Sequence, residues 1–199
     1  MKLLLFSDLH CDKAAARHLV ELSSQVDCLI GAGDFGTCRR RVGDTIGVLQ
    51  EITLPAVLVP GNSESAEELR AACAAWPTAH VLHGSGVMIQ GIDFFGIGGG
   101  IPVTPFGEWS YDFTEEEARQ LLSPCRCNGL LVSQSARRGA VDMSSQGVRL
   151  GSRAIYECTQ QTNPRLVVCG HIHESAGQME KVGDTPIVNA GPAGIVWTI

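Results

Sequence analysis

The stretch VVCGHIHESAG, residues 167–177, is an apolar run that ends in two histidines, His171 and His173, enclosed by glycines. Two imidazoles placed two residues apart on a tight turn are well suited to hold a ligand. Histidine is the commonest metal ligand among the side chains, and each imidazole can bind through either ring nitrogen. This stretch therefore predicts a binding turn at the end of a strand, and the other strand ends decide what it holds.

Outward from this stretch, short apolar runs alternate with amphipathic segments along the whole chain. Strands are predicted at residues 2–8, 27–34, 55–62, 128–134 and 165–171. Helices are predicted at residues 13–26, 43–52, 65–76, 114–122 and 152–161, with Ser63 or Ser65 capping the third. This alternation predicts parallel strands joined by right-handed crossovers.

Two segments depart from that rhythm. Residues 79–100 contain short β runs broken by glycines, as in hairpins at a sheet edge, and residues 185–199 predict two strands around a turn. No repeat, low-complexity tract or linker divides the sequence. We therefore expect a single domain over residues 1–199.

Composition narrows the class of protein. The chain has 199 residues, an apolar content of 44% and a net charge of −6, which argues against an extended nucleic-acid surface or a membrane surface. No apolar run reaches 18 residues, so no membrane span is expected. The eight cysteines form no CxxC pair, which excludes a zinc ribbon. The apolar stretch in MKLLLFSDLH is too short for a signal sequence, so we expect reduced thiols and a cytoplasmic location. Cys28 and Cys169 lie in apolar runs and are predicted to be core residues.

Polar residues follow five of the predicted strands. They are Asp8 with His10, Asp34, Asn62, Gln134, and His171 with His173. One such aspartate alone is usually a turn or helix cap. Five strand ends of this kind in an open α/β sheet would converge in the crevice where ligands bind. Carboxylate, imidazole and amide groups together favour Mn, Fe or Zn over calcium, and no GxSxG or GxxxxGK[ST] motif points to other chemistry.

The ordered motifs DLH, GD, GN and GHIH, which end at His10, Asp34, Asn62 and His173, resemble the calcineurin-like metallophosphoesterase superfamily. Within it, the chain is most similar to small bacterial and archaeal members related to cyclic-nucleotide phosphodiesterases. The resemblance implies an α/β fold, a two-sheet β-sandwich flanked by helices in α/β/β/α order.

The resemblance also implies two divalent metal ions. Asp8, His10 and His173 would hold the first ion, and Asp34 would bridge the two. Asn62 and His171 would hold the second. The implied activity is that of a metal-dependent phosphoesterase, foremost a phosphodiesterase, in which a metal-bound hydroxide attacks the phosphorus of a small phosphate ester or nucleotide. Asp34 and Asn62 would be the catalytic residues, with Asn62 also contacting the substrate.

Two positions depart from the family pattern. Ser63 stands where the GN motif usually continues with histidine, and a serine hydroxyl cannot act as a general acid near neutral pH. Gln134 stands where relatives carry a histidine ligand of the second metal, and an amide oxygen binds a transition metal more weakly than imidazole does. We expect the second site to be weak. A Gln134 side chain hydrogen-bonded to backbone, with no metal nearby, is the open alternative.

Several further side chains have two interpretations. Arg137 and Arg138 either bind substrate phosphate or belong to a solvated loop, and the same choice applies to residues 39–41, three arginines. Phe106, Trp109 and Tyr111 either stack a base or pack a loop. Glu174 and Asn189 are candidates for orienting the histidines.

Two other functions compete with catalysis by a phosphoesterase. Ser63 and Gln134 also fit a catalytically impaired member of the fold that serves as a scaffold for a protein or ligand. A nuclease is disfavoured by the acidic balance of the chain and by the absence of an extended basic groove. The sequence leaves the metal, the substrate, the partners and a homo-oligomer open.

Overall fold

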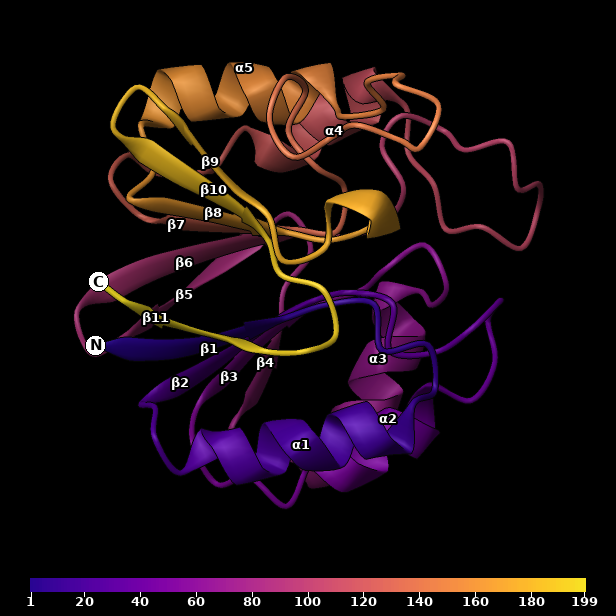
Figure 1. Cartoon of the computed structure of the whole chain (residues 1–199), viewed down its shortest axis with the longest axis vertical. Coiled ribbons are helices and arrows are strands. Elements are labelled where there is room, and N and C mark those ends of the chain that lie inside the picture. Colours follow the sequence, from indigo (N-terminus) through magenta and orange to yellow (C-terminus); the bar gives the residue numbers. More distant parts are fainter.

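Two β-sheets pack face to face in the computed structural model, which describes residues 1–199, and helices cover both outer faces (Figure 1). The first sheet has the order β11-β1-β2-β3-β4 and contains β1 (Lys2–Phe6), β2 (Cys28–Ala32), β3 (Ala56–Val59), β4 (Ala79–Val81) and β11 (Ile195–Thr198). The second has the order β5-β6-β7-β8-β10-β9 and contains β5 (Ser85–Ile89), β6 (Ile92–Ile97), β7 (Leu130–Ser133), β8 (Leu166–Cys169), β9 (Met179–Val182) and β10 (Thr185–Asn189). The fold is α/β, with two mixed sheets between helices, as predicted.

The helices divide between the two outer faces. The first sheet carries α1 (Lys13–Ser23), α2 (Val42–Leu49) and α3 (Ala66–Ala72), and the second carries α4 (Glu115–Leu122) and α5 (Arg153–Thr162). Two 3-10 turns, η1 (Cys73–Ala75) and η2 (His173–Ser175), follow α3 and β8. Ser65 caps α3 with Glu68 in a capping box, which confirms one of the two predicted caps.

Three apolar layers hold this arrangement together, and β1 shows how one strand serves two of them. Leu3 and Leu5 belong to the cluster between the sheets, whereas Leu4 and Phe6 belong to the cluster under the helices of the first sheet. Because successive side chains of a strand point to opposite faces, a strand buried on both sides reads as one continuous apolar run. The third cluster lies between the second sheet and its helices.

The irregular segments of the sequence are where the prediction and the structure differ. β4 joins the first sheet parallel to β3, and β5 and β6 form an antiparallel hairpin whose outer strand alone is at the sheet edge. β9 was not predicted, because only two of the four residues in its sequence MEKV are apolar and three of the four are exposed. Cys28 and Cys169 are fully buried, as predicted, and all eight cysteines are free thiols.

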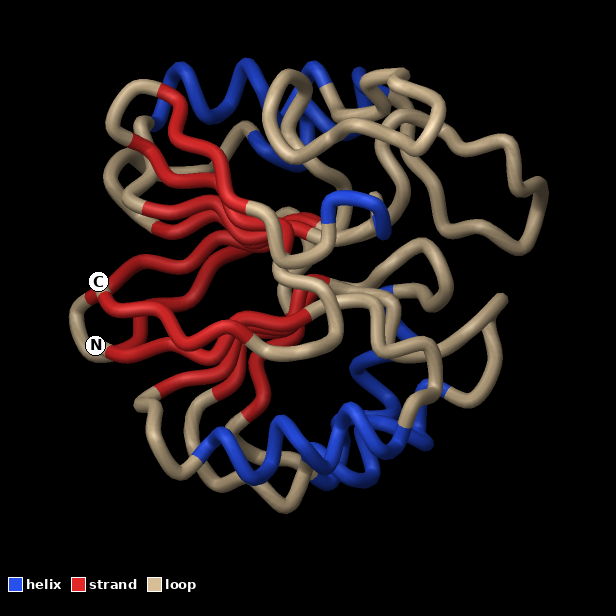
Figure 2. Tube along the Cα trace, viewed as in Figure 1, coloured by secondary structure: helices blue, strands red, loops and turns tan.

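The loops after the parallel strands gather at one end of the two sheets, opposite to the two chain termini (Figure 2). Strands β1, β2 and β3 run parallel in the first sheet, and β7 and β8 run parallel in the second. Their carboxyl ends therefore bring the predicted polar residues to a common region. No helix of the chain is long and apolar enough to cross a membrane.

Candidate metal centre

The loops after β1 and β2 run side by side and set the first group of side chains. The backbone N–H of Asp8 donates to the Gly33 carbonyl at 2.9 Å, and that of His10 donates to the Asp34 carbonyl at 2.9 Å. Asp8, His10, Asp34 and His171 all adopt positive φ, between 43° and 69°. Such left-handed conformations cost about 1–3 kcal/mol each for residues other than glycine, and they concentrate at functional sites.

Asp8, His10 and His173 come together although the chain separates them widely. Their ligand atoms all lie within 4.8 Å of one another. His10 Nε2 is 3.1 Å from His173 Nε2, and His173 Nε2 is 3.8 Å from Asp8 Oδ1. His10 Nε2 is also 3.6 Å from Asp34 Oδ2, which places the proposed bridging carboxylate beside this group.

The charge balance of this region fits a bound cation. Asp8, Asp34 and Glu64 are 7%, 3% and 1% exposed, and none of the three pairs with a lysine or an arginine. Burial raises the pKa of Asp34 well above its usual range, and the negative charges of Glu64 and Asp8 raise it further. Buried charges of one sign are costly unless an opposite charge or a metal compensates them. A divalent metal ion would supply that compensation.

The Asp8 carboxylate is held by donors on both oxygens. Ser7 Oγ donates to Asp8 Oδ2 at 2.6 Å, and the His171 backbone N–H donates to Asp8 Oδ1 at 3.0 Å. Ser7 Oγ in turn accepts the Gly191 N–H at 2.9 Å. The carboxylate is therefore fixed before any ligand binds, as a preorganised site requires.

Gln134 reaches into the same group. Its Nε2 donates to Asp8 Oδ1 at 3.2 Å, and its Oε1 is fully buried with no hydrogen-bond donor. The Gln134 side chain thus contacts a predicted metal ligand, and it makes no hydrogen bond to backbone. A buried acceptor without a partner is costly, and a cation would satisfy this one.

Asn62 and Ser63, in the loop after β3, lie next to Asp34. The Ser63 N–H donates to Asp34 Oδ1 at 2.8 Å. Asn62 Nδ2 donates to Ser110 Oγ at 3.0 Å, so the amide oxygen is left as the free acceptor of that side chain. The orientation of Asn62 therefore agrees with a ligand role.

His171 lies beside this group. Its backbone N–H donates to Asp8, but its imidazole is not part of the cluster formed by Asp8, His10 and His173. Burial lowers the pKa of the His171 imidazole, which favours the neutral, metal-binding form. Asn189 Nδ2 donates to the carbonyls of Gly170 and Ile172, at 3.2 and 2.9 Å, and so fixes the backbone on both sides of His171. Glu174 is exposed and makes no bond to either imidazole.

Ser7, Glu64 and Ser110 also belong to the site, although the sequence did not predict a role for them. Glu64 accepts three backbone N–H groups, from Gly61 at 2.7 Å, Gly36 at 2.9 Å and Phe35 at 3.3 Å. It thereby ties the loop after β2 to the loop after β3. A carboxylate two residues after Asn62 of the GN motif, in a turn of small residues, was the available signal for Glu64. Serine hydroxyls carry no such signal.

Arg137 does not lie with the predicted site residues. It is 3% exposed, its Nε donates to Thr159 Oγ1 at 2.9 Å, and its guanidinium carbon lies 4.5 Å from the centre of the Tyr156 ring. The chain turns outward after β7, so this arginine packs against α5. Arg138 is exposed next to it. The structure therefore gives Arg137 a packing role, in place of the phosphate contact that its position after Gln134 had indicated.

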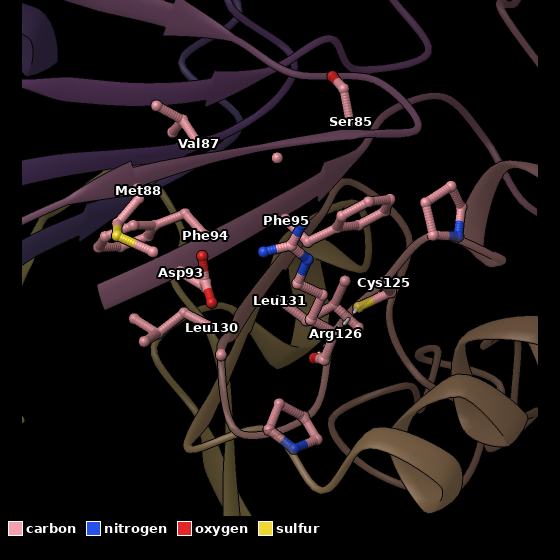
Figure 3. A pocket seen from close by; sticks show the side chains of 14 residues that line it. Ser85, Val87, Met88, Asp93, Phe94, Phe95, Cys125, Arg126, Leu130 and Leu131 are labelled. Carbon is pink, nitrogen blue, oxygen red and sulfur yellow. Dashed lines mark hydrogen bonds between the residues drawn. The ribbon is translucent and has the colours of Figure 1, made fainter. Parts of the chain in front are cut away.

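A separate cavity of about 310 Å³ lies at the opposite end of the second sheet. Figure 3 shows its lining side chains, which come from β5, β6 and the start of β7, with Arg126 and Cys125 from the preceding loop. Leu130 lines it at the first residue of β7, whereas Gln134 follows the last. None of the predicted site residues lines this cavity, so it is distinct from the candidate metal centre.

Comparison with known proteins agrees with this fold. The model of the calcineurin-like phosphoesterase superfamily domain matches residues 1–198. An uncharacterized protein of Methanocaldococcus jannaschii is 29% identical over 203 residues, covering 96% of this chain and 88% of that protein. The chain belongs to the calcineurin-like phosphoesterase superfamily.

Solved structures share the fold at low sequence identity. A protein of Thermus thermophilus superposes with a TM-score of 0.78 at 17% identity, covering 96% of this chain and 90% of that one. A dimetal phosphatase from Danio rerio superposes with a TM-score of 0.63 at 12% identity, covering 97% of this chain and 88% of that one. Both show the same arrangement of sheets and helices.

Proposed function

We propose that this protein is a metal-dependent phosphoesterase, with phosphodiesters as its preferred substrates and Mn²⁺ as one metal that serves it. One observation carries the proposal: Asp8 and Asp34 are buried carboxylates without a lysine or arginine partner, and the imidazoles of His10 and His173 face each other beside them. The family of the chain and the dimetal phosphatase with the same fold support it.

Within this proposal, Asp8, His10 and His173 would hold one metal ion, Asn62, His171 and Gln134 would hold a second, weaker one, and Asp34 would contribute to both sites. When bound, the ions would polarise the phosphoryl oxygens and lower the pKa of a coordinated water. The protein's own part is orientation. Ser63 and Ser110 fix Asp34 and Asn62, at 2.8 and 3.0 Å, so that little reorganisation is needed when substrate binds.

The preferred substrate follows from the absence of a general acid beside Asp34. Ser63 stands beside Asp34, and its hydroxyl does not release a proton to a leaving alcohol near neutral pH. Esters whose leaving group is stable as an anion should therefore react best. A nitrophenyl ester is such a substrate, and an alkyl monoester is a poor one.

The test is hydrolysis of bis(p-nitrophenyl) phosphate by metal-stripped protein titrated with Mn²⁺. Asp34→Asn removes the proposed bridging carboxylate, and Asp184→Asn makes the same change at a fully exposed position in the β9–β10 turn. We expect metal-dependent turnover that Asp34→Asn abolishes and Asp184→Asn retains. Equal rates in all three proteins at every Mn²⁺ concentration would contradict the proposal.

A second candidate is a catalytically impaired scaffold. It is favoured by the bond from Gln134 Nε2 to Asp8 Oδ1, because that contact occupies a proposed ligand oxygen. A scaffold would show no Mn²⁺-dependent turnover above the Asp34→Asn protein. The hydrolysis experiment therefore separates the two functions.

A further inference from the structure

A cavity of about 480 Å³ opens directly beside the candidate metal centre, within the usual size range of ligand pockets. Its lining residues come from the loops after β1 and β2 and from the irregular segment before α4: His10, Cys11, Thr37, Cys38, Arg40, Arg41 and Trp109. His10 belongs both to this wall and to the metal cluster. A single ligand that fills the cavity would therefore be able to place its phosphate at the metals.

The wall of the cavity is cationic although the chain as a whole has a net charge of −6. Arg40 and Arg41 line it, and no carboxylate does. The three arginines of residues 39–41 are not equivalent. Arg39 Nε is 2.8 Å from Glu68 Oε2, and Arg41 Nε is 2.8 Å from Asp44 Oδ2. Arg40 has no carboxylate partner, so its guanidinium is the one free to bind an anion.

The turn that presents Arg40 is ordered by its own hydrogen bonds. Thr37 and Arg40 exchange two backbone bonds of 3.0 Å, and both central residues of the turn have positive φ, 46° for Cys38 and 62° for Arg39. The Arg39 N–H also donates to the Ser63 carbonyl at 2.8 Å, which ties the turn to the metal-centre loops. Arg40 is thus held in place by the same loops that position Asp34.

Trp109 supplies an aromatic wall. Its ring lies parallel to that of Phe106, with centroids 5.7 Å apart and 14° between the planes, and Phe106 is 50% exposed. Two stacked rings at the rim of a cavity form a platform for a third aromatic ring. Nucleic-acid bases bind by stacking on aromatic side chains, and every base has a π-face that can do so.

We propose that this cavity determines substrate specificity, with Trp109 stacking an aromatic base and Arg40 binding a second anionic group. The substrate class is then a nucleotide-like phosphodiester that carries another phosphate, with the ester to be cleaved at the metal centre. This inference rests on the proposed phosphoesterase function for its catalytic part only.

Three p-nitrophenyl esters with the same leaving group test the recognition: ethyl p-nitrophenyl phosphate, thymidine 5′-(p-nitrophenyl phosphate), and the latter compound with an added 3′-phosphate. We expect kcat/KM to rise in that order. Trp109→Ala should lower the preference for the thymidine ester over the ethyl ester about tenfold. Arg40→Ala should lower the preference for the 3′-phosphate to near one. Arg17→Ala, an exposed arginine of α1, should retain both preferences.

Binding of thymidine 3′,5′-bisphosphate, measured by calorimetry without turnover, separates this inference from the proposed function. Binding by the wild type that Arg40→Ala and Trp109→Ala each weaken about tenfold supports the cavity, even if no ester is hydrolysed. Hydrolysis with equal preferences in the wild type and both variants would overturn the cavity assignment and leave the phosphoesterase intact. Binding unchanged in both variants would overturn it as well.

Discussion

The Nε2 atoms of His10 and His173 lie 3.1 Å apart, although 163 residues separate the two histidines in the chain. Neither imidazole nitrogen has another side chain at that distance, and Asp8 and Asp34 are the nearest carboxylates. Two ring nitrogens that face each other beside buried carboxylates form a ligand set that is incomplete without a cation.

Gln134→His should strengthen the second metal site. An imidazole binds a transition metal better than an amide oxygen does, so we expect the affinity for the second equivalent of Mn²⁺ to rise about tenfold. Isothermal titration of metal-stripped protein measures it, and Gln160→His on the exposed side of α5 is the matched control. An unchanged second affinity would place Gln134 outside the second site.

The fold could be predicted because β1, β2, β3, β7 and β8 are almost entirely buried and therefore read as apolar runs. The ends of those runs also located Asp8, His10 and His173, since parallel strands bring their carboxyl ends together. β9 could not be predicted, because three of its four residues are exposed and two of them, Glu180 and Lys181, are charged.

Other parts of the site depend on contacts that no local pattern encodes. Ser7 and Glu64 are ordinary residue types whose roles come from the groups that they bond in three dimensions. The prediction for Arg137 was wrong because sequence does not show to which side the chain turns after a strand. Its partners, Thr159 and Tyr156, lie on α5.

Gly33→Ala should destabilise the protein. Gly33 has a φ of +92°, and an added Cβ would lie 2.1 Å from Gln134 Oε1. We expect a loss of about 1–3 kcal/mol in the free energy of unfolding from backbone strain alone, measured by urea denaturation. Gly47→Ala is the matched control, because Gly47 is an exposed position of α2 where an added Cβ would meet nothing within 4 Å. This substitution should stabilise the protein by up to about 1 kcal/mol. A neutral Gly33→Ala would contradict the close approach of Gln134.

Arg137→Ala should lower stability and leave substrate affinity as it is. The Arg137 guanidinium donates to Thr159 Oγ1 at 2.9 Å and to the Arg138 carbonyl at 2.8 Å. The substitution leaves both acceptors without this donor. We expect a loss of about 1–3 kcal/mol, read from urea unfolding. Arg138→Ala, at the exposed neighbouring position, should change stability little. A raised KM for bis(p-nitrophenyl) phosphate at unchanged stability in Arg137→Ala would restore the phosphate-binding role.

Calorimetric titration of metal-stripped protein with Mn²⁺ tests most directly whether Asp8, His10 and His173 hold a metal ion. His173→Ala removes one ligand whose side chain is 61% exposed, so the fold should tolerate the change, and His18→Ala on α1 is the control. We predict that His173→Ala weakens the tightest site at least tenfold and that His18→Ala binds like the wild type. Equal affinity for Mn²⁺ in the wild type and both variants would contradict a metal site formed by these three residues.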